Sequence, residues 1–260
     1  MSVTIHPTAL VNPNAQLADG VVVDPYAIIG EYVEIGEGTR IGAHCVVDGH
    51  TRIGAHNTFY PFISIGLAPQ DKKYAGEPTR LEIGDHNTIR ECCTINIGTV
   101  QDQGVTRIGN QNWIMAYVHI AHDCQLGNSI TIANSTQLAG HVHIGDYAVL
   151  GGFTGVHQFC RIGAYAMTSV GTVLLQDLPP YVMADGDPAV PRAINSEGLK
   201  RRGFDADSIL AIRRAYKTLY RKGLKLEEAK SEIEKDAGEW QVLERLSSFL
   251  NGATHRGIVR

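Results

Sequence analysis

The feature that most constrains this chain is a six-residue spacing of aliphatic side chains. Every sixth residue from Ile108 to Ile162 is Ile, Leu or Val, and glycine follows five of these ten residues. The same spacing runs from Ile5 to Ile65, with a phenylalanine at one position. Because a short repeat of fixed period is typical of solenoids, this aliphatic hexad predicts a parallel β-helix.

Three hexads are expected to complete one 18-residue coil, with one short strand and one corner in each hexad. The aliphatic side chain then points into the coil and stacks on its counterpart three hexads later. Corner residues need turn conformations, including positive φ, that Gly, Asn, Asp and His tolerate. Such residues stand at the predicted corners Ala43-His44, Gly49-His50, Ala55-His56, Asp85-His86, Asn128-Ser129, Asn134-Ser135 and Gly140-His141.

The spacing is interrupted twice, near residues 67–80 and 98–105, and the phase has moved by one residue after the second interruption. We expect both segments to be loops that leave the β-helix at a corner. Long loops on a rigid scaffold often carry function. A tolerated insertion would produce the same pattern.

After Ile162 the repeat weakens and a different organisation begins. From about Asn195 the apolar spacing is helical, and Asp207 is expected to cap a helix that stops before Gly223. Residues 226–237 and 239–251 predict two further helices. A linker before these helices is predicted from Pro179, Pro180, Pro188 and Pro191.

The predicted fold is therefore mainly β, with two parts. Residues 1–190 are expected to form the parallel β-helix, and residues 191–260 a small α-helical domain. A helical unit of this size would be marginally stable alone. It is therefore expected to pack on the β-helix or on a neighbouring subunit.

Composition and charge exclude several classes of function. The net charge of −4 provides no basic field for nucleic acid. No apolar run approaches the roughly 18 residues of a membrane span. The first ten residues, MSVTIHPTAL, lack the basic and apolar regions of a signal peptide. Five cysteines without a CxxC pair are most simply interpreted as thiols of a cytosolic protein.

The 18-residue coil places several histidines on one edge. His119 and His122 fall in one coil, His141 in the next, and His157 in the third. Gly140 lies directly over residue 122. Since neighbouring strands are about 4.8 Å apart, these five residues are expected to line one edge within roughly 10 Å.

His122 is followed by Asp123, and a carboxylate beside an imidazole can orient the ring and raise its basicity. This pair is a candidate general base, but other interpretations remain open. Corner histidines such as His44 and His86 are frequent in this chain, so the cluster could consist of ordinary turn residues. Histidines on adjacent strands could also bind zinc, as in γ-class carbonic anhydrases, which are shorter and lack a helical tail. A purely structural or binding β-helix is a further alternative.

Several longer segments resemble the UDP-N-acetylglucosamine O-acyltransferases, which catalyse the first step of lipid A biosynthesis. They are His119–Cys124, Gly140-His141, Val156–Cys160, Gln70–Arg80 and Glu197–Phe204. The resemblance covers nearly the whole chain, and the last two segments distinguish it from the N-acyltransferase that acts later in the pathway. They also argue against an acetyl-coenzyme A-dependent acetyltransferase. The resemblance to hexapeptide-repeat acyltransferases further implies a left-handed β-helix.

The resemblance implies a cytoplasmic homotrimer with three active sites, each between two neighbouring β-helices. The acyl donor would be a (R)-3-hydroxyacyl group carried as a thioester on acyl carrier protein. The acceptor would be the glucosamine 3-hydroxyl of UDP-N-acetylglucosamine. Neither a metal nor a free cofactor is implied.

The family's functional positions can be matched to residues of this sequence. His122 matches the general base, Asp123 would orient it, and Gly140 matches the position whose N–H stabilises the oxyanion. Arg201 resembles the residue facing the UDP diphosphate, a task that suits a planar guanidinium. The substrate-binding positions match Asp71, Lys73, His119, His141, His157, Gln158, Asn195, Glu197, Arg201 and Arg202.

The acyl-chain groove is where the sequence departs from the family. Val170 matches a position that is glycine in the long-chain enzymes, and Met167 is a second candidate for the groove wall. A buried methylene contributes about 0.8 kcal/mol only when it fits, so the bulk of Val170 predicts a preference for chains shorter than 14 carbons.

Overall fold

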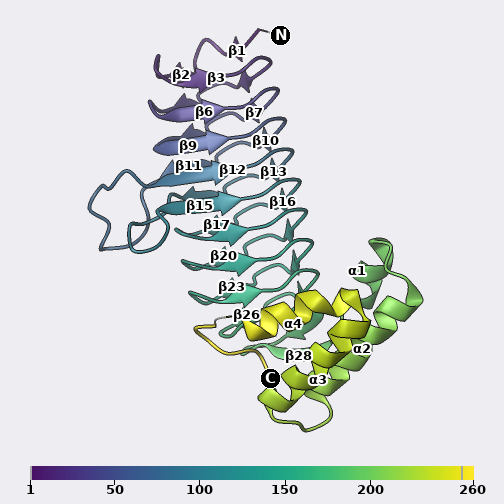
Figure 1. Cartoon of the computed structure of the whole chain (residues 1–260). Helices are drawn as coiled ribbons and strands as arrows, with labels where there is room; N and C mark the ends of the chain where they lie inside the picture. The colour runs from purple at the N-terminus through teal and green to yellow at the C-terminus, as the bar shows by residue number, and fades with distance from the viewer. Residues whose placement is uncertain (1, 253) are drawn as a thin grey trace.

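The structure, a computed structural model, describes residues 2–252 and 254–260. Its strands form three sheets, which are the three faces of one elongated β-helix, and helices lie at the C-terminal end (Figure 1). From β1 to β26, successive strands belong to the first, second and third sheet in turn, so each complete coil adds one strand to each sheet. The hexad spacing therefore predicted the parallel β-helix correctly.

The first sheet has eleven strands. They are β1 (Thr4–Ile5), β4 (Val22–Val23), β7 (Arg40–Ile41), β10 (Thr58–Phe59), β13 (Thr88–Ile89), β16 (Trp113–Ile114), β19 (Thr131–Ile132), β22 (Val149–Leu150), β25 (Met167–Thr168), β27 (Val182–Asp185) and β28 (Val190–Ile194). All neighbours in this sheet are parallel except β27 and β28, which form an antiparallel hairpin.

The second and third sheets have nine and eight strands. The second sheet consists of β2 (Leu10–Val11), β5 (Ile28–Ile29), β8 (Val46–Val47), β11 (Ser64–Leu67), β14 (Thr94–Asn96), β17 (His119–Ile120), β20 (Gln137–Leu138), β23 (Gly155–Val156) and β26 (Val173–Leu174). The third consists of β3 (Gln16–Leu17), β6 (Val33–Ile35), β9 (His50–Ile53), β12 (Arg80–Ile83), β15 (Val105–Ile108), β18 (Gln125–Leu126), β21 (His143–Ile144) and β24 (Arg161–Ile162).

The register of the coils agrees with the 18-residue spacing. Ile120 pairs with Leu138 and Leu138 with Val156, so each hexad side chain stacks on its counterpart one coil later. These side chains are buried and belong to one continuous apolar core. At the N-terminal end the first coil is covered on one side only, and Ile5 is 45% exposed.

The corners adopt the positive φ predicted for them, and aromatic residues share this conformation. Seven predicted corner residues have positive φ: His44, Gly49, His56, His86, Ser129, Ser135 and His141. Eight further corners with positive φ are aromatic and were not predicted: Tyr26, Phe62, Tyr117, Tyr147, Phe153, Phe159, Tyr165 and Tyr181. Many of these rings stack from coil to coil, as Tyr26, His44 and Phe62 do at 5.0 Å. Stacking is worth about 0.5–1.5 kcal/mol, which is comparable with the roughly 1–2 kcal/mol cost of a left-handed residue.

Both interruptions of the repeat are loops, as predicted, and both leave the corner that joins the second sheet to the third. The first loop connects β11 to β12, and the second connects β14 to β15 (Figure 1). The register shows that they add chain to two successive coils. Ser64 pairs with Thr94 and Thr94 pairs with His119, so both coils are longer than the regular 18-residue coil.

The predicted linker is wrong, because residues 182–194 continue the first sheet as the β27–β28 hairpin. Pro191 lies in β28, which is the last strand of that sheet. An edge strand tolerates proline because its outer side needs no backbone N–H donor.

The predicted helices are present, with corrected ends. The three predicted helices correspond to α2 (Ala206–Tyr220), α3 (Leu226–Glu239) and α4 (Glu244–Asn251). Two further elements were not predicted, the short helix α1 (Ser196–Arg201) and the 3-10 helix η1 (Gln241–Leu243). The prediction that Asp207 caps α2 is wrong, because the extended residue Asp205 accepts the hydrogen bond from the Ser208 N–H. Asp207 lies inside the first turn.

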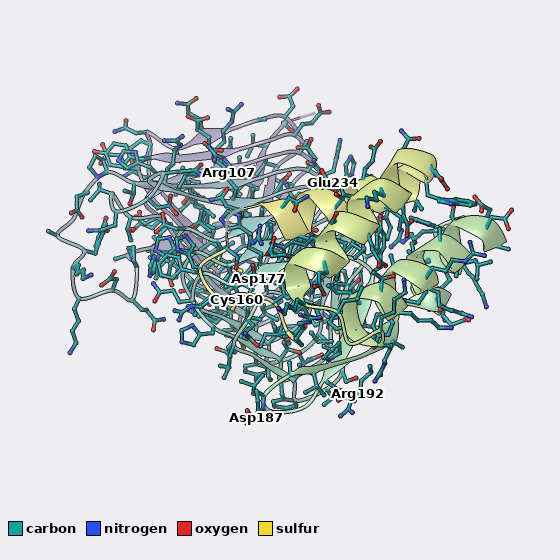
Figure 2. All side chains as sticks on the ribbon, turned by 60° about the horizontal axis from the view of Figure 1, so that its bottom comes forward. Arg107, Cys160, Asp177, Asp187, Arg192 and Glu234 are labelled. Carbon is teal, nitrogen blue, oxygen red and sulfur yellow. The ribbon has the colours of Figure 1, made fainter. Side chains whose placement is uncertain are left out.

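The helices and the end of the chain fold back on the last coils. The Tyr181 hydroxyl donates to the Val242 carbonyl at 2.7 Å. Asp177, labelled near the centre of Figure 2, is fully buried and accepts from Arg161 and from the Thr254 hydroxyl. The expected division after residue 190 falls inside β28, and it stays a prediction. Within the described residues, no helix is long and apolar enough to cross a bilayer.

Candidate active site

The centre of the site is the imidazole–carboxylate pair His122–Asp123, at the corner that follows β17. The His122 Nδ1 atom lies 2.8 Å from Asp123 Oδ2, and both residues are buried. Asp123 has a φ of 60°, so it adopts the left-handed conformation of the other hexad corners. The contact therefore joins two consecutive residues at one corner of the β-helix.

Asp123 is held by two threonines of the preceding coil, Thr99 in the second loop and Thr106 in β15. The Thr99 N–H donates to Oδ1 at 2.9 Å and the Thr99 hydroxyl to Oδ2 at 2.6 Å. The Asp123 N–H donates to the Thr106 hydroxyl at 2.8 Å. Burial favours the neutral carboxyl, but the hydrogen bonds from His122 and Thr99 outweigh it and lower the pKa of Asp123.

This network determines the tautomer of His122. An ionised carboxylate only accepts hydrogen bonds, so Nδ1 carries the proton that is shared with Asp123. In the neutral ring, Nε2 is then left with a lone pair. That nitrogen faces Gly140, where an added Cβ would lie 2.7 Å from it. Any side chain at residue 140 would therefore displace the ring.

Gly140 also presents an available backbone donor. Its flanking residues, Ala139 and His141, donate their N–H groups to Val156 and His122 carbonyls. Among the hydrogen bonds of the described residues, none uses the N–H of Gly140 as donor. A free N–H beside a basic nitrogen is the arrangement that acyl transfer requires, because an oxyanion forms next to the attacking group.

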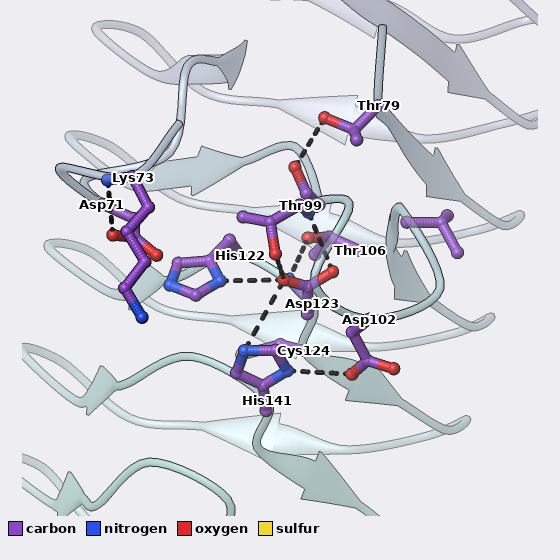
Figure 3. A network of polar contacts seen from close by, with 12 residues as sticks. Asp71, Lys73, Thr79, Thr99, Asp102, Thr106, His122, Asp123, Cys124 and His141 are labelled. Atoms are coloured by element: carbon purple, nitrogen blue, oxygen red, sulfur yellow. Dashed lines mark hydrogen bonds and ion pairs between the residues drawn. The ribbon is translucent and has the colours of Figure 1, made fainter. Parts of the chain in front are cut away.

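His141 forms a second imidazole–carboxylate pair one coil further along (Figure 3). Its Nδ1 atom lies 2.8 Å from Asp102 Oδ2, and its Nε2 atom lies 3.8 Å from Asp123 Oδ2. The ring meets that of His122 edge-on at 5.1 Å and stacks on Phe159 at 4.5 Å. Asp102 belongs to the second loop, which reaches across from another coil.

His119 lies on β17, three residues before His122. Its Nδ1 atom lies 2.7 Å from the Thr94 hydroxyl of the preceding coil. Burial, and then repulsion from His122, lower the pKa of His119. The lowered pKa favours the neutral ring, which suits a hydrogen-bonding role beside His122.

A pocket of about 490 Å³ opens next to His141. Asp71 and Lys73 of the first loop line it together with Asp102 of the second. Its remaining lining includes Gln158 and Phe159 of the next corner and His255 of the C-terminal tail. Segments from five parts of the chain therefore converge on one pocket beside the His141–Asp102 pair.

His122, Asp123 and His141 are also close enough together to be candidate ligands of a metal ion. One nitrogen of His122, one of His141 and an Asp123 oxygen lie within 4.8 Å of one another, and three such ligands could hold zinc. However, Asp123 Oδ2 already accepts from His122 and Thr99. A metal would have to replace these hydrogen bonds, so the arrangement favours a hydrogen-bonded pair.

Comparisons with known proteins agree with this geometry. Residues 106–140 match the family model described as bacterial transferase hexapeptide (six repeats), and residues 177–259 match UDP N-acetylglucosamine O-acyltransferase, domain 2. The acyl-[acyl-carrier-protein]–UDP-N-acetylglucosamine O-acyltransferase of Thiobacillus denitrificans is 63% identical over 99% of both chains. The corresponding protein of a Janthinobacterium species is 64% identical over 98% of this chain and 99% of its own. The chain belongs to the UDP-N-acetylglucosamine O-acyltransferase family.

Solved structures of this family have the same fold. The UDP-N-acetylglucosamine O-acyltransferase of Moraxella catarrhalis superimposes with a TM-score of 0.96 at 47% identity, covering 98% of this chain and 99% of its own. That of Francisella novicida gives 0.97 at 44% identity, covering 99% and 94%. The protein is thus an acyltransferase with a left-handed parallel β-helix and C-terminal helices, as its sequence predicted.

Some residues matched to the family do not join the pocket of a single chain. His157 is exposed, and its ring contacts the Gln158 carbonyl. Val170 is 74% exposed and follows β25, so it lies at the corner between the first and second sheets. Met167, in β25 itself, lies in the first sheet, away from the corner of His122.

The family positions near α1 lie on the third edge of the β-helix. Asn195 caps α1 and donates to the Tyr165 carbonyl at 3.1 Å. The Arg202 guanidinium lies 4.7 Å from the centre of the Tyr147 ring. Glu197 pairs with Lys200 at 2.8 Å, and Arg201 extends from the same exposed helix. These residues are positioned by the corner between the third and first sheets, not by the corner of His122.

Sequence reasoning missed Thr99, Asp102, Thr106 and His255. Thr99 and Asp102 lie in the loop that breaks the hexad phase, so the 18-residue spacing cannot align them with His122 and His141. Thr106 follows the same loop. His255 comes from the tail, where no repeat exists. The sequence offered one signal for Thr99 and Asp102: polar residues interrupt the repeat just before the coil that carries His119 and His122.

Proposed function

We propose that the protein transfers a (R)-3-hydroxyacyl chain from acyl carrier protein to the 3-hydroxyl of UDP-N-acetylglucosamine, the first step of lipid A biosynthesis. The observation that carries this proposal is the pairing of a carboxylate-oriented base, His122, with an unused N–H at Gly140. The names of the curated relatives support the same donor and acceptor. Cytoplasmic location is part of the proposal.

In the proposed mechanism, His122 acts as a general base. Its Nε2 lone pair accepts the proton of the sugar hydroxyl as the oxygen attacks the thioester carbonyl, a step worth about 10²–10⁴-fold. The oxyanion then accepts a hydrogen bond from the Gly140 N–H. As the C–S bond breaks, the imidazolium returns its proton to the thiolate of the carrier. Asp123 keeps the ring in the required tautomer throughout.

The substrate contacts are assigned by the family positions. Asp71, Lys73 and His141 line the pocket and would contact the sugar and the acyl group. His119 would complete this contact set on β17, and His157 with Gln158 would contact the nucleotide. No cofactor is needed, because the acyl group arrives as an activated thioester.

We propose that the working form is a homotrimer. Gly140, Val170 and Arg202 stand on three different edges of one β-helix, so one chain alone cannot surround a substrate with them. A neighbour rotated about a threefold axis would bring a second edge to the first. Asn195, Glu197, Arg201 and Arg202 would then approach the nucleotide from an adjacent subunit.

The acyl-chain groove would be closed by Val170 and Met167, which favours donors shorter than 14 carbons. Val170 has an exposed side chain that another subunit could cover. The expected result is higher kcat/KM for shorter donors, and a shift to longer donors in Val170→Gly. Best activity with 14 carbons in the native protein would contradict this length preference.

The test of the reaction uses purified protein, UDP-N-acetylglucosamine and (R)-3-hydroxyacyl carrier proteins of increasing chain length. Mass spectrometry should detect the O-acylated sugar nucleotide, and a 3-deoxy acceptor should give none. Transfer from acetyl-coenzyme A, with no transfer from any acyl carrier protein, would assign the protein to the acetyltransferases instead.

A further inference from the structure

We propose that Asp102 is a positioning residue for acyl transfer, because it holds the His141 imidazole in the site from the second loop. This inference rests on the proposed function and adds a second imidazole–carboxylate pair to it. The two pairs, His122–Asp123 and His141–Asp102, stand on successive coils (Figure 3).

His141 needs a partner that selects one orientation of its ring. Stacking on Phe159 at 4.5 Å fixes the plane of the imidazole, but it does not distinguish the two orientations that a ring flip interconverts. The bond from Nδ1 to Asp102 at 2.8 Å makes that choice. It leaves the His141 Nε2 atom directed toward the His122–Asp123 pair, 3.8 Å from Asp123 Oδ2.

The second loop supports both pairs at once. Thr99 donates twice to Asp123, and Asp102 of the same loop accepts from His141. The loop is closed on itself, because the N–H groups of Asp102 and Gly104 both donate to the Thr99 carbonyl. One rigid turn therefore sets the relative positions of the two imidazole rings.

The hydrogen bond between His141 and Asp102 is partly shielded from solvent, so it can hold the imidazole in place. The His141 side chain is 9% exposed and that of Asp102 is 35% exposed. Hydrogen bonds to an ionised partner are roughly twice as strong as neutral ones, and a surface pair would be weaker. Without Asp102, the His141 ring could flip, and its Nε2 atom would no longer be held toward the His122–Asp123 pair.

The experiment is a double-mutant cycle with Asp102→Ala, His141→Ala and the double variant, using the transfer assay of the whole protein. In the native background, Asp102→Ala should lower kcat/KM about tenfold, and Asp102→Asn, which keeps an acceptor oxygen, should lose less. In the His141→Ala background, Asp102→Ala should cost less than about twofold, because no ring remains to position. Asp185→Asn, which removes a carboxylate paired with Arg192 on the distant hairpin, is the matched control.

A spectroscopic measurement separates positioning from loop stability. In histidine-labelled protein, the Nδ1 proton of His141 should give a downfield signal that disappears in Asp102→Ala while that of His122 stays. Equal losses from Asp102→Ala with and without His141 would overturn the proposal, as would an unchanged His141 signal. Absence of transfer by the native protein, with the signal pattern as expected, would instead contradict the proposed function and leave the pairing established.

Discussion

At the scale of single residues, the geometry of the site depends on residue 140 being glycine. Gly140 lies so close to His122 that an added Cβ would meet the ring at 2.6 Å. The ring is held on its other side by Asp123, so it cannot retreat without losing that hydrogen bond. The close approach of His122 to Gly140 thus depends on the absence of one methyl group.

Gly140→Ala should therefore inactivate the protein without unfolding it. A displacement of about 1 Å in a reacting group can cost about 10²-fold, and we expect a loss of that size in kcat. The matched control is Gly155→Ala in β23, where a Cβ would meet no atom within 4 Å. Transfer assays and thermal unfolding of both variants make the comparison, and native-like activity of Gly140→Ala would contradict the arrangement.

His119 should make stability depend on pH. Burial and the neighbouring His122 lower its pKa below the unperturbed 6.5, so the unfolded chain takes up a proton before the folded one. The free energy of unfolding should therefore fall between pH 7 and pH 5, by at most about 1.4 kcal/mol per pH unit from this residue. Urea unfolding at both pH values should show a shallower decrease in His119→Gln. An equal or steeper decrease would mean that burial of this imidazole contributes nothing.

Sequence reasoning succeeded for the residues that follow the repeat. His122, Gly140 and His141 were placed together because the 18-residue spacing holds between their coils. Thr99 and Asp102 could not be placed, since the second loop adds residues whose path depends on contacts rather than on a period. The double hydrogen bond from Thr99 to Asp123 exists only after that loop has folded.

At the scale of elements, each strand has only two to five residues and gains its stability from the coils above and below it. Hexad side chains in the middle of the stack are fully buried, whereas those of the first coil are not. The same residue type at the same hexad position should therefore contribute very differently along the stack.

Ile132→Ala and Ile5→Ala test this difference. Ile132 is completely buried in β19, so its truncation should cost about 2–5 kcal/mol of unfolding free energy. Ile5 is 45% exposed in β1, and its truncation should cost less than about 1 kcal/mol. Chemical unfolding of the two variants gives the comparison. Similar losses of unfolding free energy in the two variants would contradict the claim that the first coil contributes less stability than the middle of the stack.

Elements outside the repeat were predicted less well. The prolines at 188 and 191 suggested a linker, but an edge hairpin accommodates them because its outer strand needs no further donors. The α2 cap was displaced by two residues because Asp205 and Asp207 have equal capping propensity, and only the backbone conformation of Asp205 distinguishes them. Aromatic corners were missed because their stacking partners lie a full coil away.

At the scale of the whole molecule, the corner between the first and second sheets is left uncovered in one chain. It carries four large aromatic side chains that are 56–67% exposed: Tyr26, Phe62, Tyr117 and Phe153. Large exposed apolar side chains gathered along one edge are typical of an interface. This corner supports the proposed trimer, in which site residues from different edges meet.

Phe62→Arg should weaken that assembly. A charge placed in an apolar interface is costly to desolvate, so light scattering should show a shift from three times the 28.2 kDa chain mass toward one. Leu210→Arg, an equally drastic change at an exposed position of α2, is the control. A trimer that persists in Phe62→Arg and Phe153→Arg would place the interface elsewhere, and a native monomer would contradict the trimer itself.

The most direct test of the central claim, a metal-free base at His122, is acyl transfer by the native protein and by His122→Ala, each with and without a chelator. The predicted result is transfer that survives chelation and falls at least about a hundredfold in His122→Ala. His86→Ala, at a corner histidine stacked on His56, should retain activity. Native activity in His122→Ala, or activity that chelation abolishes and zinc restores, would contradict the claim.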